Sequence, residues 1–139
     1  MSWRRSTSCA MLVVDASCLA EIVLAGSDAE PVRERLESDP EQAAPYLVDA
    51  EVLGVVRRAH LRGELDGTAA HQAIDDLGSW PATRVDHRPL LERAWQLRDS
   101  LSAPDALYVA LAEALNATLL TLDGRLARAA GPRCRIDIP

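Results

Sequence analysis

Four acidic residues stand where carboxylates can do chemistry. Asp15 and Asp123 each directly follow a short apolar run of the kind that forms a buried strand. Glu51 lies on the apolar stripe of a helical segment, and Asp105 begins the most apolar helical segment of the chain. A carboxylate that is buried without a cation or a hydrogen-bond donor costs several kcal/mol. These four positions therefore need a specific explanation.

A shared metal site is one such explanation. In a parallel α/β fold, the carboxyl ends of the strands lie at one edge of the sheet, where ligands bind. Four carboxylates in one pit cannot all stay ionised without a cation. Hard oxygen ligands select Mg²⁺ or Mn²⁺. Such ions activate water and stabilise the attacking and leaving oxygens of a phosphodiester. The four acids thus predict metal-dependent hydrolysis of phosphodiesters.

Each acid also has a structural interpretation that the sequence leaves open. Asp15 and Asp123 are good N-cap residues for the helices that follow them. Asp105 stands three residues after Ser102, as the acidic member of a capping box does. Glu51 could be an ordinary partner of a nearby arginine. Its neighbour Asp49 competes for the same role, but its place near a helix start suits capping and dipole compensation.

Short apolar strands alternate with helices along the chain, and no hairpin signal such as Asn-Gly occurs. This pattern predicts βαβ units and a short parallel sheet covered on both faces, which is an α/β/α sandwich. Residues 11–139 are expected to form a single domain, preceded by a loosely ordered extension at residues 1–10. The predicted strands are residues 11–14, 45–47, 82–85, 118–122 and 134–138. The predicted helices are residues 16–25, 29–37, 48–62, 68–77, 90–101, 106–115 and 124–130.

Composition excludes several classes of enzyme. The 139 residues are 48% hydrophobic and 26% charged, with a net charge of −6, as in a folded globular domain. All 15 basic residues are arginine. The lack of lysine excludes Schiff-base chemistry, a Walker-type phosphate site and the phosphoacceptor receiver domains. Haloacid-dehalogenase-type phosphatases need a second Asp two residues after the first, and that residue here is Ser17.

The cysteines and the apolar runs indicate a cytoplasmic protein. Cys9, Cys18 and Cys134 are odd in number and lack metal-ligand spacing, so we expect inert thiols in a reducing compartment. The apolar run at residues 10–14 is too short for a signal peptide. No stretch approaches the roughly 20 apolar residues of a membrane span.

The chain resembles the PIN-domain nucleases, and most closely the VapC toxins of VapBC toxin–antitoxin pairs. The resemblance covers nearly the whole chain from Met11 onward. The order Asp, Glu, Asp, Asp with these neighbours is specific as a set, although no single motif is. The segments that carry it are residues 11–17, 49–58, 105–113 and 119–123. One departure is Pro104, where an aromatic residue is more usual before the third acid.

The resemblance implies a Mg²⁺- or Mn²⁺-dependent endoribonuclease with a PIN-like fold. Asp15 and Asp105 would be the principal metal ligands, with Glu51 and Asp123 completing the acidic site directly or through water. Ser17 occupies the Ser/Thr position beside the first acid and would hydrogen-bond a carboxylate or a phosphate.

Thr121 is a similar candidate for orienting the site. The alternative from another functional class is a PIN-like domain that has lost catalysis and only binds RNA or a protein.

The resemblance also implies partners, which are a small VapB-like antitoxin and a second copy of the chain. The apolar residues of the helical segments 16–25 and 29–37 are candidates for a groove that takes an amphipathic antitoxin helix. They are Ile22, Val23, Leu24, Val32 and Leu36. The antitoxin would insert a basic side chain, often arginine, into the acidic pit.

The substrate would be RNA. A net charge of −6 opposes RNA binding, but the four site acids and any bound cations account for most of it. Local groups of arginine offer phosphate contacts, and we expect Arg125 and Arg128 to touch RNA because they follow Asp123. The arginines in question are Arg57, Arg58, Arg62, Arg125, Arg128, Arg133 and Arg135.

Overall fold

A parallel sheet of five strands forms the centre of the molecule, in the order β3-β2-β1-β4-β5. The computed structural model describes residues 11–139, so the predicted extension at residues 1–10 lies outside the described residues. Every neighbouring pair of strands is parallel. The strands are β1 (Met11–Val14), β2 (Glu41–Pro45), β3 (Thr83–Val85), β4 (Thr118–Leu120) and β5 (Ile136–Asp137).

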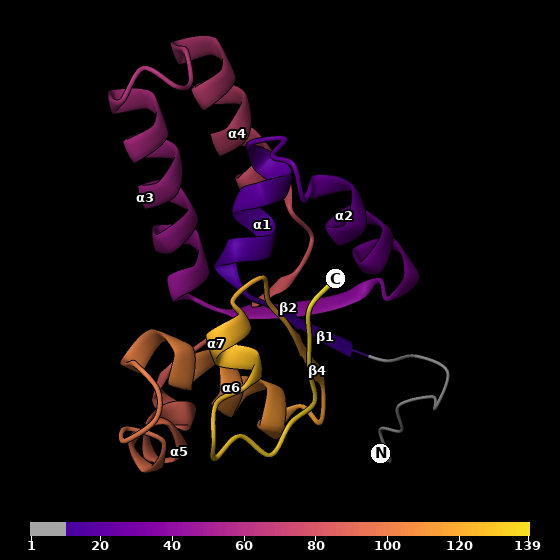
Figure 1. Cartoon of the computed structure of the whole chain (residues 1–139), viewed down its shortest axis with the longest axis vertical. Coiled ribbons are helices and arrows are strands. Elements are labelled where there is room, and N and C mark those ends of the chain that lie inside the picture. The colour runs from indigo at the N-terminus through magenta and orange to yellow at the C-terminus, as the bar shows by residue number, and fades with distance from the viewer. Residues whose placement is uncertain (1–10) are drawn as a thin grey trace.

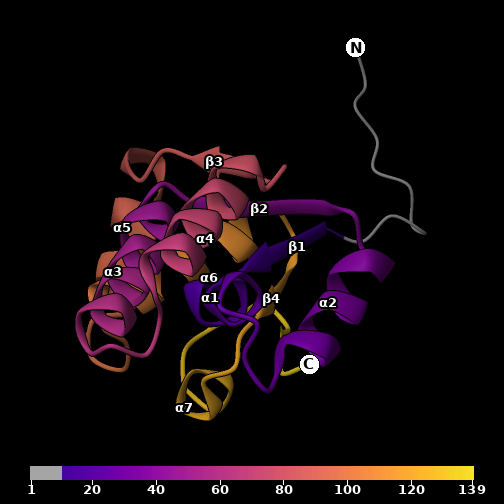
Figure 2. The ribbon, with the colours of Figure 1, turned by 90° about the horizontal axis from the view of Figure 1, so that it is seen from above.

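Helices cover both faces of this sheet, which confirms the α/β/α sandwich. Helices α1 to α4 lie on one side and α5 and α6 on the other (Figure 1). The same layers are visible from above (Figure 2). The helices are α1 (Ala16–Val23), α2 (Ala29–Ser38), α3 (Leu47–Leu61), α4 (Gly67–Ser79), α5 (Leu91–Gln96), α6 (Ala103–Ala114) and α7 (Gly124–Ala127).

The alternation of side chains along β1 explains why the strand is apolar throughout. Leu12 and Val14 pack with Val32 of α2, while Val13 belongs to the cluster that includes the buried residues of α6. All four of these side chains are fully buried. A strand that is buried on both faces reads as a continuous apolar run, which is how the sequence predicted it.

Several predicted boundaries are wrong. The strand expected at residues 45–47 is β2, which lies at Glu41–Pro45 and ends where α3 begins. Its residues are not strongly apolar, and its pairing with β1 places it, with Met11 opposite Glu41. The helix expected at residues 90–101 is only α5, preceded by a short 3₁₀ turn at Arg88–Leu90. The helix expected at residues 68–77 is α4, which runs from Gly67 to Ser79.

Helices α3 and α4 form an antiparallel pair that projects away from the sheet (Figure 1). The connection turns at Gly63, whose φ of 77° is readily available only to glycine. Helix α4 starts at the N-cap Asp66, whose carboxylate accepts a hydrogen bond from the backbone N–H of Ala69. The lower end of this pair, at the start of α3, lies next to the carboxyl edge of the sheet (Figure 1).

Candidate active site

The strand order places a topological switch point between β1 and β4. From β1 the chain builds β2 and β3 on one side, and later β4 and β5 on the other. In open α/β sheets, ligands bind in the crevice outside the carboxyl ends of such a strand pair. Asp15 follows β1, and its N–H donates to the carbonyl of Leu120 at the end of β4 over 2.9 Å. Asp15 therefore stands at the switch point.

Two hydroxyl groups orient Asp15. Its Oδ2 accepts hydrogen bonds from Ser17 Oγ at 2.8 Å and from Thr121 Oγ1 at 2.7 Å. Asp15 is the N-cap residue of α1 by position, but its side chain makes no capping hydrogen bond. Asp15 is only 8% exposed, and its carboxylate is directed to the hydroxyls rather than to the helix. Ser17 and Thr121 lie beside Asp15, as the sequence led us to expect.

Glu51 is held by a residue that sequence reasoning missed. Its Oε1 accepts a hydrogen bond of 2.8 Å from the hydroxyl of Tyr108, a fully buried side chain of α6. In the part of the chain that the structure describes, Glu51 has no arginine partner, so the ion pair considered above is absent. The available signal was a tyrosine three residues after Asp105 on a helix apolar nearly all round, where a hydroxyl needs a partner.

Asp105 and Asp123 lie at helix starts. Ser102 is the N-cap of α6 and its Oγ accepts from the N–H of Asp105 at 3.4 Å, which confirms the predicted cap. Asp123 caps α7, since its Oδ1 accepts from the N–H of Arg125 at 2.9 Å. Its Oδ2 also lies 3.3 Å from the guanidinium of Arg125. The capping interpretation therefore applies to Asp123, in addition to its place beside the site.

The pKa values of Glu51 and Asp105 are both affected by the charges of neighbouring acids. Burial raises the pKa of Glu51, and the charges of Asp15 and Asp105 add to this against the hydrogen bond from Tyr108. Burial likewise raises the pKa of Asp105, followed by the charge of Asp15 and a smaller contribution from Asp123. Thr121 links two of the acids, because its hydroxyl donates to Asp15 and accepts from the N–H of Asp123. We call the four acids the acidic row, with Glu51 and Asp123 as its ends and Asp15 and Asp105 between them.

The end of the row at Asp123 differs from the rest. Partial burial acts to raise the pKa of Asp123, but the N–H and guanidinium of Arg125 outweigh it, and the pKa is lowered.

Asp49, the competitor of Glu51, lies outside the row. Its carboxylate pairs with Arg84, with the closest approach at 2.9 Å. The sequence analysis chose Glu51 over Asp49 from its place on the apolar stripe, but it did not predict that Asp49 pairs with Arg84.

The residues of the row suit a hard divalent cation by their chemistry. Every donor is a carboxylate or hydroxyl oxygen, the ligand type of Mg²⁺ and Mn²⁺. Among residues 11–139, however, no three acidic, histidine or cysteine side chains are gathered closely enough to form a finished metal site. Mg²⁺ keeps several of its waters, so it does not require such a cage. Asp15, Glu51, Asp105 and Asp123 are the residues that would hold it.

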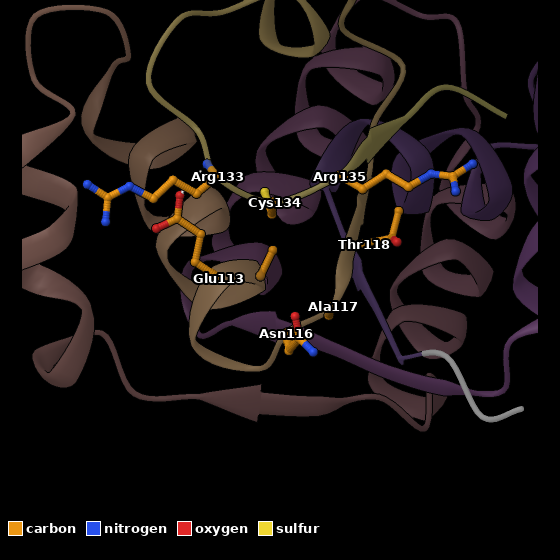
Figure 3. A pocket seen from close by; sticks show the side chains of 8 residues that line it. Glu113, Asn116, Ala117, Thr118, Arg133, Cys134 and Arg135 are labelled. Carbon is orange, nitrogen blue, oxygen red and sulfur yellow. Dashed lines mark hydrogen bonds between the residues drawn. The ribbon is translucent and has the colours of Figure 1, made fainter. Parts of the chain in front are cut away.

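Away from the acidic row, a hollow of about 450 Å³ lies around the end of α6 and the start of β4. Figure 3 shows the sulfur of Cys134 inside it, with the side chains of Arg133 and Arg135 pointing away in opposite directions. Burial raises the pKa of the Cys134 thiol to about 11, so the thiol is an unreactive group. Glu113 in its wall is satisfied by Arg93 and by the N–H of Arg133. The carboxylate in this hollow is thus compensated.

The parallel sandwich with an acidic switch point defines an α/β domain of the kind found in metal-dependent nucleases. The sequence profile of the PIN domain family matches residues 12–132. Ribonuclease VapC1 of Mycobacterium tuberculosis (strain ATCC 25618 / H37Rv) is 44% identical over 128 residues, which are 91% of this chain and 96% of that protein. The chain therefore belongs to the PIN-domain family, among its VapC ribonucleases.

Further comparisons agree with this assignment. Ribonuclease VapC12 of the same organism is 35% identical over 92% of this chain and 98% of its own length. The crystal structure of VapBC2 from Rickettsia felis, bound to a DNA fragment from its promoter, superposes with a TM-score of 0.68 at 16% identity. That match covers 92% of this chain and 98% of the other. Mycobacterium tuberculosis VapC20, a Sarcin-Ricin loop cleaving toxin, superposes with a TM-score of 0.64 at 21% identity, covering 84% and 92%. Both structures share the fold.

None of the helices between residues 11 and 139 combines the length and the apolar character needed to cross a bilayer. Cys18 and Cys134 are free thiols, as predicted, and Cys9 lies outside the described residues. Burial raises the pKa of Cys18 to about 12, so it too is unreactive.

Proposed function

We propose that this protein is a divalent-metal-dependent endoribonuclease and the toxin of a toxin–antitoxin pair. The observation that carries the proposal is the row of Glu51, Asp15, Asp105 and Asp123 at the switch point of a PIN-family fold. Two of these acids, Glu51 and Asp105, have pKa values raised by burial and by their neighbours. Such uncompensated charge is costly unless a ligand uses it.

Magnesium or manganese is the cation that these oxygen donors favour. When bound, it would supply a water nucleophile and neutralise charge on the phosphodiester. The protein's own residues prepare the place. Ser17 and Thr121 fix Asp15 through two hydrogen bonds to one oxygen, which leaves Oδ1 free to face a ligand. Tyr108 does the same for Glu51, whose Oε2 stays free.

The proposal is tested by RNA cleavage with the purified chain. We expect cleavage with Mg²⁺ or Mn²⁺ and none after EDTA treatment. Isothermal titration with either metal separates a nuclease from a domain that only binds RNA. An inactive domain would bind RNA without cleaving it and without a need for metal, which would contradict the proposal.

The partner is expected to be a small VapB-like antitoxin, and the toxin is expected to be a homodimer. The predicted groove is only partly available, because Val32 is fully buried inside the protomer. A hollow of about 330 Å³ does lie between α1, α2 and α4, with Ile22, Val23 and Trp80 among its lining residues. This mainly apolar hollow supports the docking of an amphipathic helix.

Expression of the chain alone should arrest growth, and co-expression with the antitoxin should restore it. A pull-down from the native host, combined with the identity of the neighbouring upstream reading frame, names the antitoxin. If no small protein co-purifies and the chain is harmless alone, the toxin assignment fails even where the nuclease assignment stands.

A further inference from the structure

Two arginines near the acidic row have the same relation to a glycine four residues earlier. A β-carbon placed on Gly54 would lie 3.3 Å from Nη1 of Arg58. A β-carbon placed on Gly124 would lie 2.9 Å from Nη1 of Arg128. Each guanidinium therefore lies back along the chain, over the bare backbone of its glycine. Any larger residue at either glycine would push the guanidinium away.

The two arginines stand at opposite ends of the acidic row. Gly54 is three residues beyond Glu51 on α3, about 5 Å along the helix axis. Gly124 directly follows Asp123, the acid at the other end. Asp15 lies between these ends, because its charge acts on Glu51 and its carboxylate shares the Thr121 hydroxyl with the N–H of Asp123. Asp105 lies there too, because its charge acts on Glu51 and the charge of Asp123 acts on it. One cation is thus placed on each side of the site.

Neither cation is neutralised. Among residues 11–139, seven arginines pair with a carboxylate, namely Arg33, Arg35, Arg84, Arg88, Arg93, Arg125 and Arg135. Arg58 and Arg128 are exposed and form no ion pair with any described residue. Neither arginine forms an ion pair with an acid of the nearby row. Both guanidinium groups are therefore free to bind an external anion.

We propose that Arg58 and Arg128 bind the two phosphates of single-stranded RNA that flank the phosphodiester held at the acidic row. This inference rests on the proposed nuclease function and adds to it how the strand is held. RNA that crosses four carboxylates is repelled unless cations on both sides hold it. The planar fork of arginine matches a phosphate.

A repeating polyanion fits this arrangement better than an acidic peptide does. The two cations bracket one catalytic row, so a single strand can present its reacting phosphodiester between two bound neighbours. Arg125 and Arg135, which we also considered for RNA, are already paired with Asp123 and Asp137. Pairing thus removes two of the seven candidate arginines, and of the other five only Arg58 and Arg128 lie back over a glycine that neighbours the row.

Arg57 provides a matched control. It is exposed, has no carboxylate partner among the described residues and is adjacent to Arg58. On an α-helix, Arg58 lies within about 20° of Glu51 around the axis, whereas Arg57 lies about 120° away. The variants are Arg58→Ala, Arg128→Ala, the double variant and Arg57→Ala. The probe is a short fluorescein-labelled single-stranded RNA of mixed sequence, and EDTA prevents cleavage.

The measurement is the dependence of RNA affinity on salt, from fluorescence anisotropy. Each phosphate contact on a single strand contributes about 0.7 to the slope of log K against log salt. We expect Arg58→Ala and Arg128→Ala each to reduce the slope by about 0.7, and the double variant by about 1.4. Arg57→Ala should leave the slope unchanged.

The glycines give a second, independent measurement. Gly54→Gln introduces a good helix former, so we expect the thermal midpoint to stay level or rise. It should nevertheless weaken RNA binding as Arg58→Ala does, and it should have no further effect when Arg58 is already alanine. Weaker binding without loss of stability distinguishes a displaced arginine from a damaged fold.

Slopes for Arg58→Ala and Arg128→Ala that equal that of Arg57→Ala would overturn the inference. It would also be overturned if these variants lost affinity for a polyglutamate peptide but not for RNA. Cleavage by the unaltered protein with Mg²⁺ or Mn²⁺ is measured separately. A protein that cleaves RNA with unchanged slopes refutes this inference alone, whereas a protein that never cleaves RNA refutes the proposed function.

Discussion

Helix α6 bears a carboxylate near each end, and the two are treated in opposite ways. Glu113, near its C-terminus, accepts hydrogen bonds from Nε of Arg93 at 2.6 Å and from the N–H of Arg133 at 2.7 Å. Asp105, near its N-terminus, forms no ion pair with any arginine among residues 11–139. The charges of Asp15 and Asp123 act to raise its pKa, and the smaller effect of Arg125 does not offset them. The carboxylate at the C-terminal end of α6 is therefore compensated by cations and donors, whereas the carboxylate at the N-terminal end forms no ion pair with a described residue.

The helix dipole alone would lower the pKa of Asp105 and raise that of Glu113, which is the reverse of what is found. It favours a negative charge at the N-terminus, where Asp105 lies, and disfavours one at the C-terminus. Yet the pKa of Asp105 is raised, by burial and by Asp15. The pKa of Glu113 is lowered, because Arg93 and Arg133 outweigh its burial. The surrounding charges and burial therefore outweigh the helix dipole. Asp105, at the N-terminal end, is the carboxylate whose charge a bound cation would compensate.

Asp105→Asn gives the largest expected effect, because it removes an anionic ligand and keeps the shape of the side chain. We expect RNA cleavage to fall by more than about a hundredfold, the upper limit for loss of a residue that only supports a metal ligand. The free energy of unfolding, measured in urea without metal, should stay level or rise, since repulsion within the row decreases. Full activity of this variant at saturating Mg²⁺ would contradict the site.

Glu113→Gln tests the compensated, C-terminal end of the helix. The change leaves Arg93 without its carboxylate, so we expect the free energy of unfolding to fall by about 2 kcal/mol. Cleavage per folded molecule should be unchanged, because Glu113 lies far from the row along α6. Arg93→Met serves as the matched change on the other side of the pair. A variant that stays stable but loses cleavage would show that this end takes part in the reaction.

Tyr108→Phe tests the support of the site without touching a proposed ligand. The hydroxyl that holds Glu51 is lost while the buried ring remains. Partners of ligating groups typically contribute 10- to 100-fold, so we expect cleavage to fall by roughly tenfold. The same substitution made in a Glu51→Ala protein should cost almost nothing more, because the hydrogen bond between the two side chains is already absent. Additive losses would mean that Tyr108 acts by another route.

Much of the fold followed from local pattern. Helix α6 and strands β1 and β4 were predicted because their sequences are apolar nearly throughout. The structure buries most of these residues. Asp15, Asp105 and Asp123 could be placed because each ends a strand or starts a helix. Strand β2 was placed too late, because its position depends on pairing with β1, and pairing across the sheet leaves little trace in a segment such as Glu41–Pro45.

The missed parts of the site are contacts between distant segments. The hydrogen bond from Tyr108 to Glu51 joins residues 57 positions apart, and the pair Arg84 and Asp49 joins residues 35 apart. The second of these decides which acid of α3 belongs to the row. The position of Glu51 on the apolar stripe favoured it, but the spacing along one helix does not predict the arginine partner of Asp49. The arginines over Gly54 and Gly124 are local, but their importance appears only beside the assembled row.

The smallest expected effect is in the pH dependence of stability, measured by urea unfolding with EDTA present. A carboxylate whose pKa is lowered in the folded state stabilises the protein above its ordinary pKa, and this contribution is lost as the pH falls through the lowered value. Glu113 is of this type. The difference between the unaltered protein and Glu113→Gln should therefore be greatest near neutral pH and decrease in acid.

Asp105 should show the opposite sign. Its raised pKa means that the folded protein binds this proton more tightly than the unfolded chain does, so the ionised group destabilises the fold near neutral pH. The penalty is relieved as the pH falls through the raised value. Asp105→Asn should accordingly be more stable than the unaltered protein near neutral pH, with the advantage disappearing in acid. The two variants thus approach the unaltered protein from opposite sides as the pH is lowered. If both curves lay on the same side, the contrast between the two ends of α6 would be wrong, because both carboxylates would then be equally compensated in the folded state.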